Sequence, residues 1–211
     1  MLITIPYQLL ETNNVSLDNF KTDHKGRYIA PLRYISPTFQ FQDISILTCP
    51  MTISDYDQVS NRIRFDIRNQ TSFLNKINQL QESIVRKFYV KRFDILKFDI
   101  SLEEIKTMFQ FLFYGITLTL FIFPNTNVLM PAASGAGASA APFQASQLKK
   151  GDQIRCVIRI HGISMLPVRT GEFFPRFRIQ HSVPVIYRVM QATPTAVYAK
   201  TSATSAIPKE K

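Results

Sequence analysis

The chain has 211 residues, of which 45% are apolar, and a net charge of +10. This length and apolar content suffice for one large domain with a buried core, which excludes a fold that depends on disulfide staples. The two cysteines, Cys49 and Cys156, have no metal-type spacing and each lies in an apolar run, so we expect both side chains to be buried.

The positive charge is concentrated toward the C-terminus. Residues 1–148 contain 14 Lys and Arg against 12 Asp and Glu, whereas residues 149–211 contain 11 against 3. Such an excess attracts polyanions: nucleic acid, an anionic membrane surface or an acidic partner. Most of the excess is arginine within predicted strands, which favours contact with phosphates and bases over solubility alone.

The first 36 residues are polar and irregular, and we predict an extended N-terminal arm with little regular structure over 1–36. The N-terminus lacks the basic leader and cleavage site of a secretory signal, so we expect an intracellular protein that is not secreted. Residues 37–192 are predicted to form a single β-rich domain. Within it, residues 39–47, FQFQDISIL, alternate in hydrophobicity with one slip that indicates a bulge.

The next segments predict a strand, a helix, a strand and a short helix. The sequence NRIRFDIRN, residues 61–69, predicts an amphipathic strand with three outward arginines: Arg62, Arg64 and Arg68. Residues 72–89 have helical spacing, with Thr71 or Ser72 as the expected N-cap. Residues 91–100, KRFDILKFDI, predict another strand, and Ser101 with Glu104 forms a capping-box pattern that begins a helix.

Residues 107–124 carry no charge and resemble a membrane span at first sight. Polar residues and Gly115 interrupt the run, however, and the alternation in ITLTLFIF suits a strand. A helix over this segment would also reach only about 22 Å, short of a bilayer core of about 30 Å. We therefore predict one long strand or a bent pair around Gly115, and we do not expect a membrane partner.

The last third of the chain contains a loop, three strands and a tail. Residues 131–147 are rich in Ala, Gly and Ser and predict a flexible loop, and residues 193–211 predict a disordered basic tail. Residues 151–162, GDQIRCVIRIHG, predict a strand whose apolar face opposes a face with Arg155, Arg159 and His161. FFPRFRIQHS and PVIYRVMQ predict two more strands, giving seven or eight strands and one or two helices in total.

No catalytic or cofactor motif has the context that its chemistry needs. GAGASA, residues 135–140, fits a dinucleotide fingerprint, but Pro131 and Pro142 flank it where a strand and a helix are required. The three histidines lack metal-ligand spacing. Cys156 and His161 lie five positions apart and point to opposite faces of a strand. We expect no enzymatic activity, cofactor, metal or small-molecule substrate.

The remaining pattern is basic and aromatic. We predict a nucleic-acid-binding face formed, if its strands pair, by Lys149, Lys150, Arg155, Arg159, His161, Phe173, Phe174, Arg176 and Arg178, with Arg62, Arg64 and Arg68 extending it. Charge of this kind follows phosphates, and aromatic rings stack on any base, which suits single-stranded binding. Phe173 and Phe174 fit a stacking role and a core role equally well.

The segment LKKGDQIRCVIRIHGISML, followed by FRIQHSVPVIYRV, resembles the closing strands of oligonucleotide-binding (OB) folds, in which a lysine-glycine turn opens a strand that runs into a glycine bend. This resemblance covers about residues 147–190. More loosely, the whole chain is similar to single-stranded DNA-binding proteins of large DNA viruses. The resemblance implies a mainly β, OB-like barrel with extended termini that coats single-stranded DNA in replication or recombination.

Three alternatives remain open. In the first, the ligand is RNA instead of DNA. In the second, the protein is a virion structural or assembly component, such as a minor capsid or genome-associated protein. In the third, which we rank last, it is a membrane-associated protein that uses residues 107–124. In the second case the basic surface and the extended termini would hold other virion subunits, copies of the chain itself or packaged genome.

Overall fold

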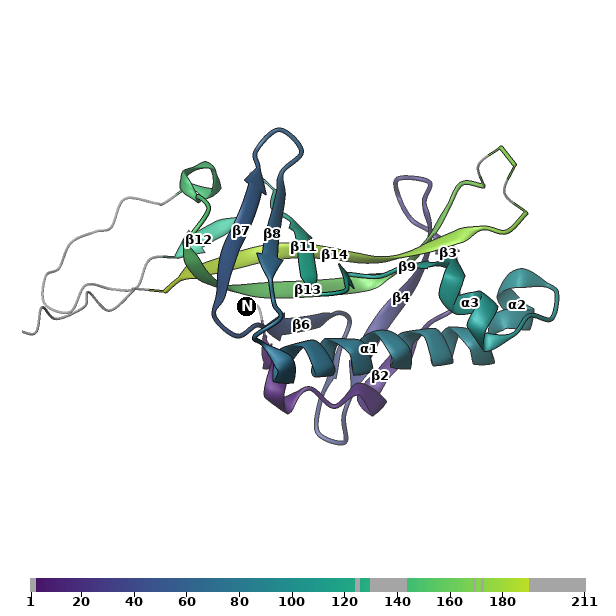
Figure 1. Ribbon diagram of the computed structural model, residues 1–211. Helices are drawn as coiled ribbons and strands as arrows, with labels where there is room; N and C mark the ends of the chain where they lie inside the picture. The colour runs from purple at the N-terminus through teal and green to yellow at the C-terminus, as the bar shows by residue number, and fades with distance from the viewer. Residues whose placement is uncertain (1–2, 124–125, 130–143, 169, 172, 190–211) are drawn as a thin grey trace, which may run out of the picture.

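The structure is a computed structural model that describes residues 3–123, 126–129, 144–168, 170–171 and 173–189 (Figure 1). This part of the chain is mainly β. The strands are β1 (Ile5–Pro6), β2 (Val15–Leu17), β3 (Lys21–Thr22), β4 (Tyr28–Ile35), β5 (Gln40–Phe41), β6 (Ile44–Leu47), β7 (Met51–Asp57), β8 (Arg62–Asp66), β9 (Phe109–Gln110), β10 (Phe113–Tyr114), β11 (Thr117–Phe121), β12 (Asn127–Leu129), β13 (Gln153–Leu166) and β14 (Arg176–Arg188). The helices are α1 (Thr71–Val90), α2 (Arg92–Leu96) and α3 (Leu102–Met108), with short 3-10 helices at Tyr7–Leu9, Thr12–Asn14 and Ala145–Gln147.

The two longest strands, β13 and β14, form an antiparallel hairpin at the centre of the sheet (Figure 1). The other edge of β13 pairs successively with β7, β6 and β4, and the other edge of β14 pairs in parallel with β12 and β9. Among the described residues, the main path of paired strands runs from β1 to β10 and is not closed. The mainly β class is confirmed, whereas a closed barrel is not.

The side chains of β13 alternate between the core and the opposite face of the sheet, as predicted. Ile154, Cys156, Ile158 and Ile160 are each at most 1% exposed and belong to the core. The two strands expected over residues 173–182 and 184–191 are instead one strand, β14, with an extra residue at Val183–Pro184. Proline fits this bulge because it lacks the N–H that a regular ladder position requires.

Helix α1 confirms the predicted helical spacing and covers the core side of the hairpin. Its buried stripe is Phe73, Ile77, Leu80, Ile84 and Phe88, and the Phe88 ring centroid lies 4.5 Å from that of Phe177 on β14. The N-cap prediction is wrong, because Gln70 occupies the N-cap without a side-chain hydrogen bond and Thr71 begins the helix.

The N-terminal segment is more ordered than predicted. Residues 15–35 contain β2, β3 and β4, and the Ala30, Leu32 and Tyr34 side chains of β4 are buried in the common core. The expectation of little regular structure is wrong here, because the buried residues Ala30, Leu32 and Tyr34 alternate with Pro31 and Arg33 in a strand pattern of period two. A Cβ on Gly162 of β13 would lie 2.3 Å from the carbonyl oxygen of Ala30, so only glycine permits β4 to approach this closely.

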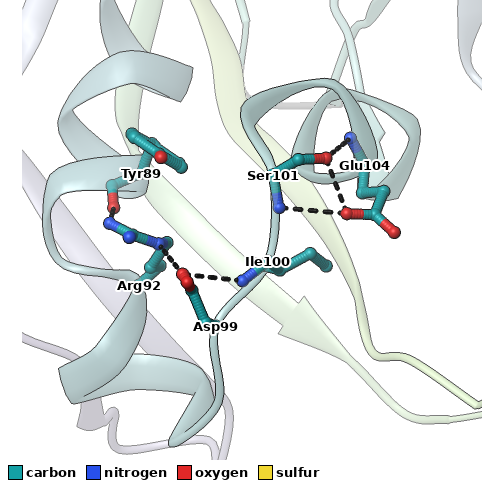
Figure 2. A network of polar contacts seen from close by, with 6 residues as sticks. All are labelled: Tyr89, Arg92, Asp99, Ile100, Ser101 and Glu104. Carbon is teal, nitrogen blue, oxygen red and sulfur yellow. Dashed lines mark hydrogen bonds and ion pairs between the residues drawn. The ribbon is translucent and has the colours of Figure 1, made fainter.

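Residues 91–100 form helix α2 and a connection to α3, so the predicted strand is wrong. Only Leu96 and Ile100 of this segment are buried, which leaves no alternating core face. Figure 2 shows how Arg92 holds the corner: its guanidinium donates to the Tyr89 carbonyl at 3.2 Å and to Asp99 at 2.8 Å. The capping box of Ser101 and Glu104 at the start of α3 is confirmed.

The uncharged run from Thr107 to Phe123 contains the bent pair predicted around Gly115. Strands β10 and β11 pair in antiparallel fashion on either side of Gly115, whose φ of +60° suits glycine. In the described part of the chain, the helices are too short or too polar to cross a membrane.

Several predicted features lie outside the described residues. They are most of the flexible loop, including GAGASA, and all of the basic tail. Both cysteines are buried, as predicted, and burial raises the pKa of Cys49 to about 11 and that of Cys156 further. The described residues contain no cluster of three or more potential metal ligands.

Candidate nucleic-acid interface

One face of the β13–β14 hairpin points away from the core and carries five predicted site residues. On β13, Arg155 and Arg159 alternate with buried residues, and Arg159 pairs with Ser182 of β14. Side chains alternate between the two faces along a strand. Arg178 and Arg176 lie four and six positions before Ser182 in β14 and therefore point to the same face. We call the set the outer strip: Arg155, Arg159, His161, Arg176 and Arg178. From Arg155 to the partner of Arg176 the strip spans about 35 Å.

The arginines toward the two ends of the strip have uncharged partners. The Arg155 Nε donates to the Thr48 carbonyl oxygen at 3.0 Å, and the Arg178 Nε donates to Gln110 Oε1 at 3.0 Å. Within the described part of the chain, no acidic side chain forms an ion pair with Arg155 or Arg178. Both guanidinium groups therefore keep their full positive charge for an anionic ligand.

The centre of the strip is partly neutralised by Asp43. Arg159 forms an ion pair with this carboxylate, and His161 Nδ1 lies 3.5 Å from its other oxygen. His161 Nε2 also lies 2.8 Å from Ser182 Oγ. Burial alone would raise the pKa of Asp43, but hydrogen bonds from His161 and Arg159 outweigh this and lower it. Asp43 therefore stays ionised and fixes both basic side chains.

The aromatic pair lies at the tip of the hairpin, outside the core. Phe173 is 94% exposed and Phe174 is 46% exposed, which excludes the core role for both. The Phe174 ring centroid lies 5.6 Å from that of Phe98, which directly precedes Asp99 in the sequence. We call Phe173 and Phe174 the tip aromatics; they directly precede Arg176 of the outer strip.

The predicted lysine pair lies at the opposite end of the strip. Lys149 and Lys150 are exposed in the turn that leads into β13, where Gly151 has a φ of +93°. The neighbouring carboxylate of Asp152 is occupied by the Lys149 backbone N–H and the Arg188 guanidinium. The two ammonium groups thus extend the positive charge beyond Arg155.

The structure does not bring the arginines in and just after β8 onto the outer strip. Arg64 and Arg68 form ion pairs with Asp55 and Asp66, respectively. Arg62 lies over the Phe121 ring, whose centroid is 5.9 Å from the ring of His181. His181 pairs with Ile160 and so faces the core side of the hairpin.

Comparison with family models, with curated proteins and with solved structures finds no match to this chain. The function is therefore inferred from the geometry of its own residues.

Sequence reasoning missed a hollow of about 480 Å³ in the outer face of the sheet, beside the centre of the strip. Its lining is Ile3, Phe41, Gln42, Asp43, Ser45, Asn127, Arg159, Pro184 and Val185. Of these only Arg159 belongs to the predicted site. The slip in the alternation of residues 39–47 was the available signal, because Gln42 and Asp43 form the break between β5 and β6.

Proposed function

We propose that this chain binds single-stranded nucleic acid along the outer strip and the tip aromatics, without catalysing a reaction. The observation that carries the proposal is that Arg155 and Arg178, which have no acidic partner among the described residues, lie toward opposite ends of one two-stranded face. A surface of this length and charge follows successive phosphates of a flexible strand. Single-stranded DNA is the proposed ligand, and RNA is the alternative.

The tip aromatics give the surface a means to contact bases as well as phosphates. Phe173 projects almost completely into solvent beside the basic strand. A base stacks on such a ring whatever its identity, so the binding is sequence-tolerant. A single strand offers unpaired bases for this contact, whereas a duplex keeps its bases stacked inside.

The proposal includes kinship with the single-stranded DNA-binding proteins of large DNA viruses, with an OB-like domain that coats DNA in replication or recombination. Two features of β13 support it. The turn of Lys149 and Gly151 opens the strand, and Gly162 lies within it where β4 makes its close approach. The virion-assembly alternative drew on extended termini, an apolar chain centre and a flexible Ala/Gly loop. Of these, the N-terminal arm loses support, because side chains from residues 15–35 pack into the common core.

Fluorescence anisotropy with a labelled oligonucleotide of about 30 nucleotides tests the proposal, with single-stranded and duplex forms measured in parallel across a salt series. We expect tighter binding to the single strand, and a linear fall in log affinity with log salt of about 0.7 per phosphate contact. Equal, weak binding to both forms would show that the charge is a generic attraction, and would favour the assembly alternative.

A further inference from the structure

The hollow beside Arg159 combines the features of a small binding pocket. Its volume of about 480 Å³ lies within the usual range for ligand sites. Phe41 and Pro184 provide flat apolar surfaces, while Gln42, Ser45 and Asn127 provide polar groups. Val185 and Ser45 flank the Val157–Arg159 segment of β13, so the hollow opens on the same face as the outer strip.

The polar groups in the hollow are available to a ligand. Within the described residues, the side chains of Gln42, Ser45 and Asn127 make no hydrogen bond to protein. Ser45 is 6% exposed and lines the hollow, so its hydroxyl faces the space that a ligand would fill. Amide and hydroxyl groups both donate and accept, which matches the mixed edge of a nucleobase.

The charges around the hollow select the kind of ligand. Arg159 lines it, and Arg155 lies on the same face about 13 Å along β13, where no acidic side chain in the described part of the chain pairs with it. A ligand that spans these positions carries a flat polar group in the hollow and negative charge along the strand. That combination is the base and the phosphates of a nucleic-acid strand.

We propose that the hollow holds one unstacked base of the bound single strand, with Phe41 as its stacking surface and the polar groups contacting its edge. This inference rests on the proposed function and adds a base-binding site distinct from the tip aromatics. It also assigns roles to Phe41 and Ser45, which have no charge and no place in the basic pattern.

The test compares an intact single strand with an abasic deoxyribose-phosphate strand of the same length, by anisotropy. Ser45→Leu fills the hollow without changing charge, and Phe41→Ala removes its aromatic surface. The matched controls are Thr119→Leu on β11 and Phe123→Ala, an exposed ring; neither residue lines the hollow. Thermal melting of each variant confirms that it is folded.

We expect both hollow variants to lose about fivefold or more in affinity for the intact strand, the effect of one stacked base, and to bind the abasic strand as the wild type does. The control variants should bind the intact strand and the abasic strand as tightly as the wild type does. If the wild type binds the intact strand but Ser45→Leu and Phe41→Ala change nothing, the base site is wrong and the proposed function stands. If the wild type binds neither strand, both the base site and the proposed function are wrong.

Discussion

The rings of Phe98 and Phe174 contact each other with their centroids 5.6 Å apart, which joins the corner between α2 and α3 to the tip of the β13–β14 hairpin. This contact occupies Phe174 and leaves its neighbour Phe173 almost fully exposed. The corner itself is held by Arg92, Asp99 and the capping box of α3 (Figure 2). A helical corner on the core side thus helps to position an aromatic residue of the proposed interface.

Phe173→Ala tests the stacking role of the tip. We expect affinity for a single strand to fall about fivefold or more, because one base loses its aromatic partner. The melting temperature should stay unchanged, because the ring buries almost no area. The control is Val59→Ala, a 96% exposed residue in the turn between β7 and β8. An equal loss in the control, or none in Phe173→Ala, would refute the role.

The salt dependence of binding tests the outer strip. In the double variant Arg155→Gln, Arg178→Gln we expect weaker binding to every sequence and a salt slope shallower by about 0.7 per lost phosphate contact. Arg64→Gln with Arg68→Gln is the matched control, because it removes the same charge from side chains already paired with Asp55 and Asp66. Equal changes of slope in the two double variants would mean that only net charge matters.

The stability of the fold should depend on pH through His181. Burial, with the nearby charges of His161 and Arg178, lowers its pKa to about 4. Because the folded pKa lies below the unfolded value of about 6.5, the stabilisation is complete above pH 6.5 and is lost as pH falls toward 4. Between pH 6.5 and 5 the expected loss is about 2 kcal/mol.

Urea unfolding at pH 7 and at pH 5 measures this loss. His181→Leu should unfold with a smaller difference between the two pH values, because it removes the buried titrating group. His24→Leu is the control, since His24 is exposed and its replacement should leave the difference as it is. A wild-type protein equally stable at both pH values would contradict the prediction.

The close approach of β4 to β13 predicts a strong effect of Gly162→Ala. The added Cβ would meet backbone atoms of Ala30 that cannot move without displacing β4. We expect a loss of about 3 kcal/mol in the free energy of unfolding, at the upper end of overpacking effects. Gly26→Ala, which has a φ of +73° but open space, should cost only about 1 kcal/mol. Chemical denaturation compares them, and similar losses would remove the steric explanation.

The sequence predicts those elements whose apolar period is uninterrupted and whose buried face is long. The stripe of α1 and the alternation of β8 and β13 meet this condition, and the structure confirms all three. Residues 91–100 carry an alternating pattern that no core face uses, because α2 buries only Leu96. In β4, the proline and arginine between the buried residues weaken the strand pattern in the sequence. The strand forms because it pairs with β13.

The candidate site likewise contains some residues that could be predicted from the sequence and others that could not. Arg155 and Arg178 were predictable because each follows the period of its own strand, and only the pairing of the strands had to be assumed. The ion pairs of Arg64 and Arg159 were not predictable, since Asp55 approaches from β7 and Asp43 from the break between β5 and β6. The hollow depends on β6, β12, β13 and β14 together, and no local pattern indicates such a meeting.

The hairpin contains two irregularities that cancel. One extra residue lies in β14 at Val183–Pro184 and one in β13 at His161, so the register beyond both is the same as it is before them. Arg155 pairs with Tyr187 and Leu166 with Arg176, as in an uninterrupted ladder. Removing either extra residue alone would shift the strand pairing by one residue in one half of the hairpin. The side chains of that half would then point to the opposite face of the sheet. Insertions and deletions in these two strands should therefore be tolerated only as compensating pairs.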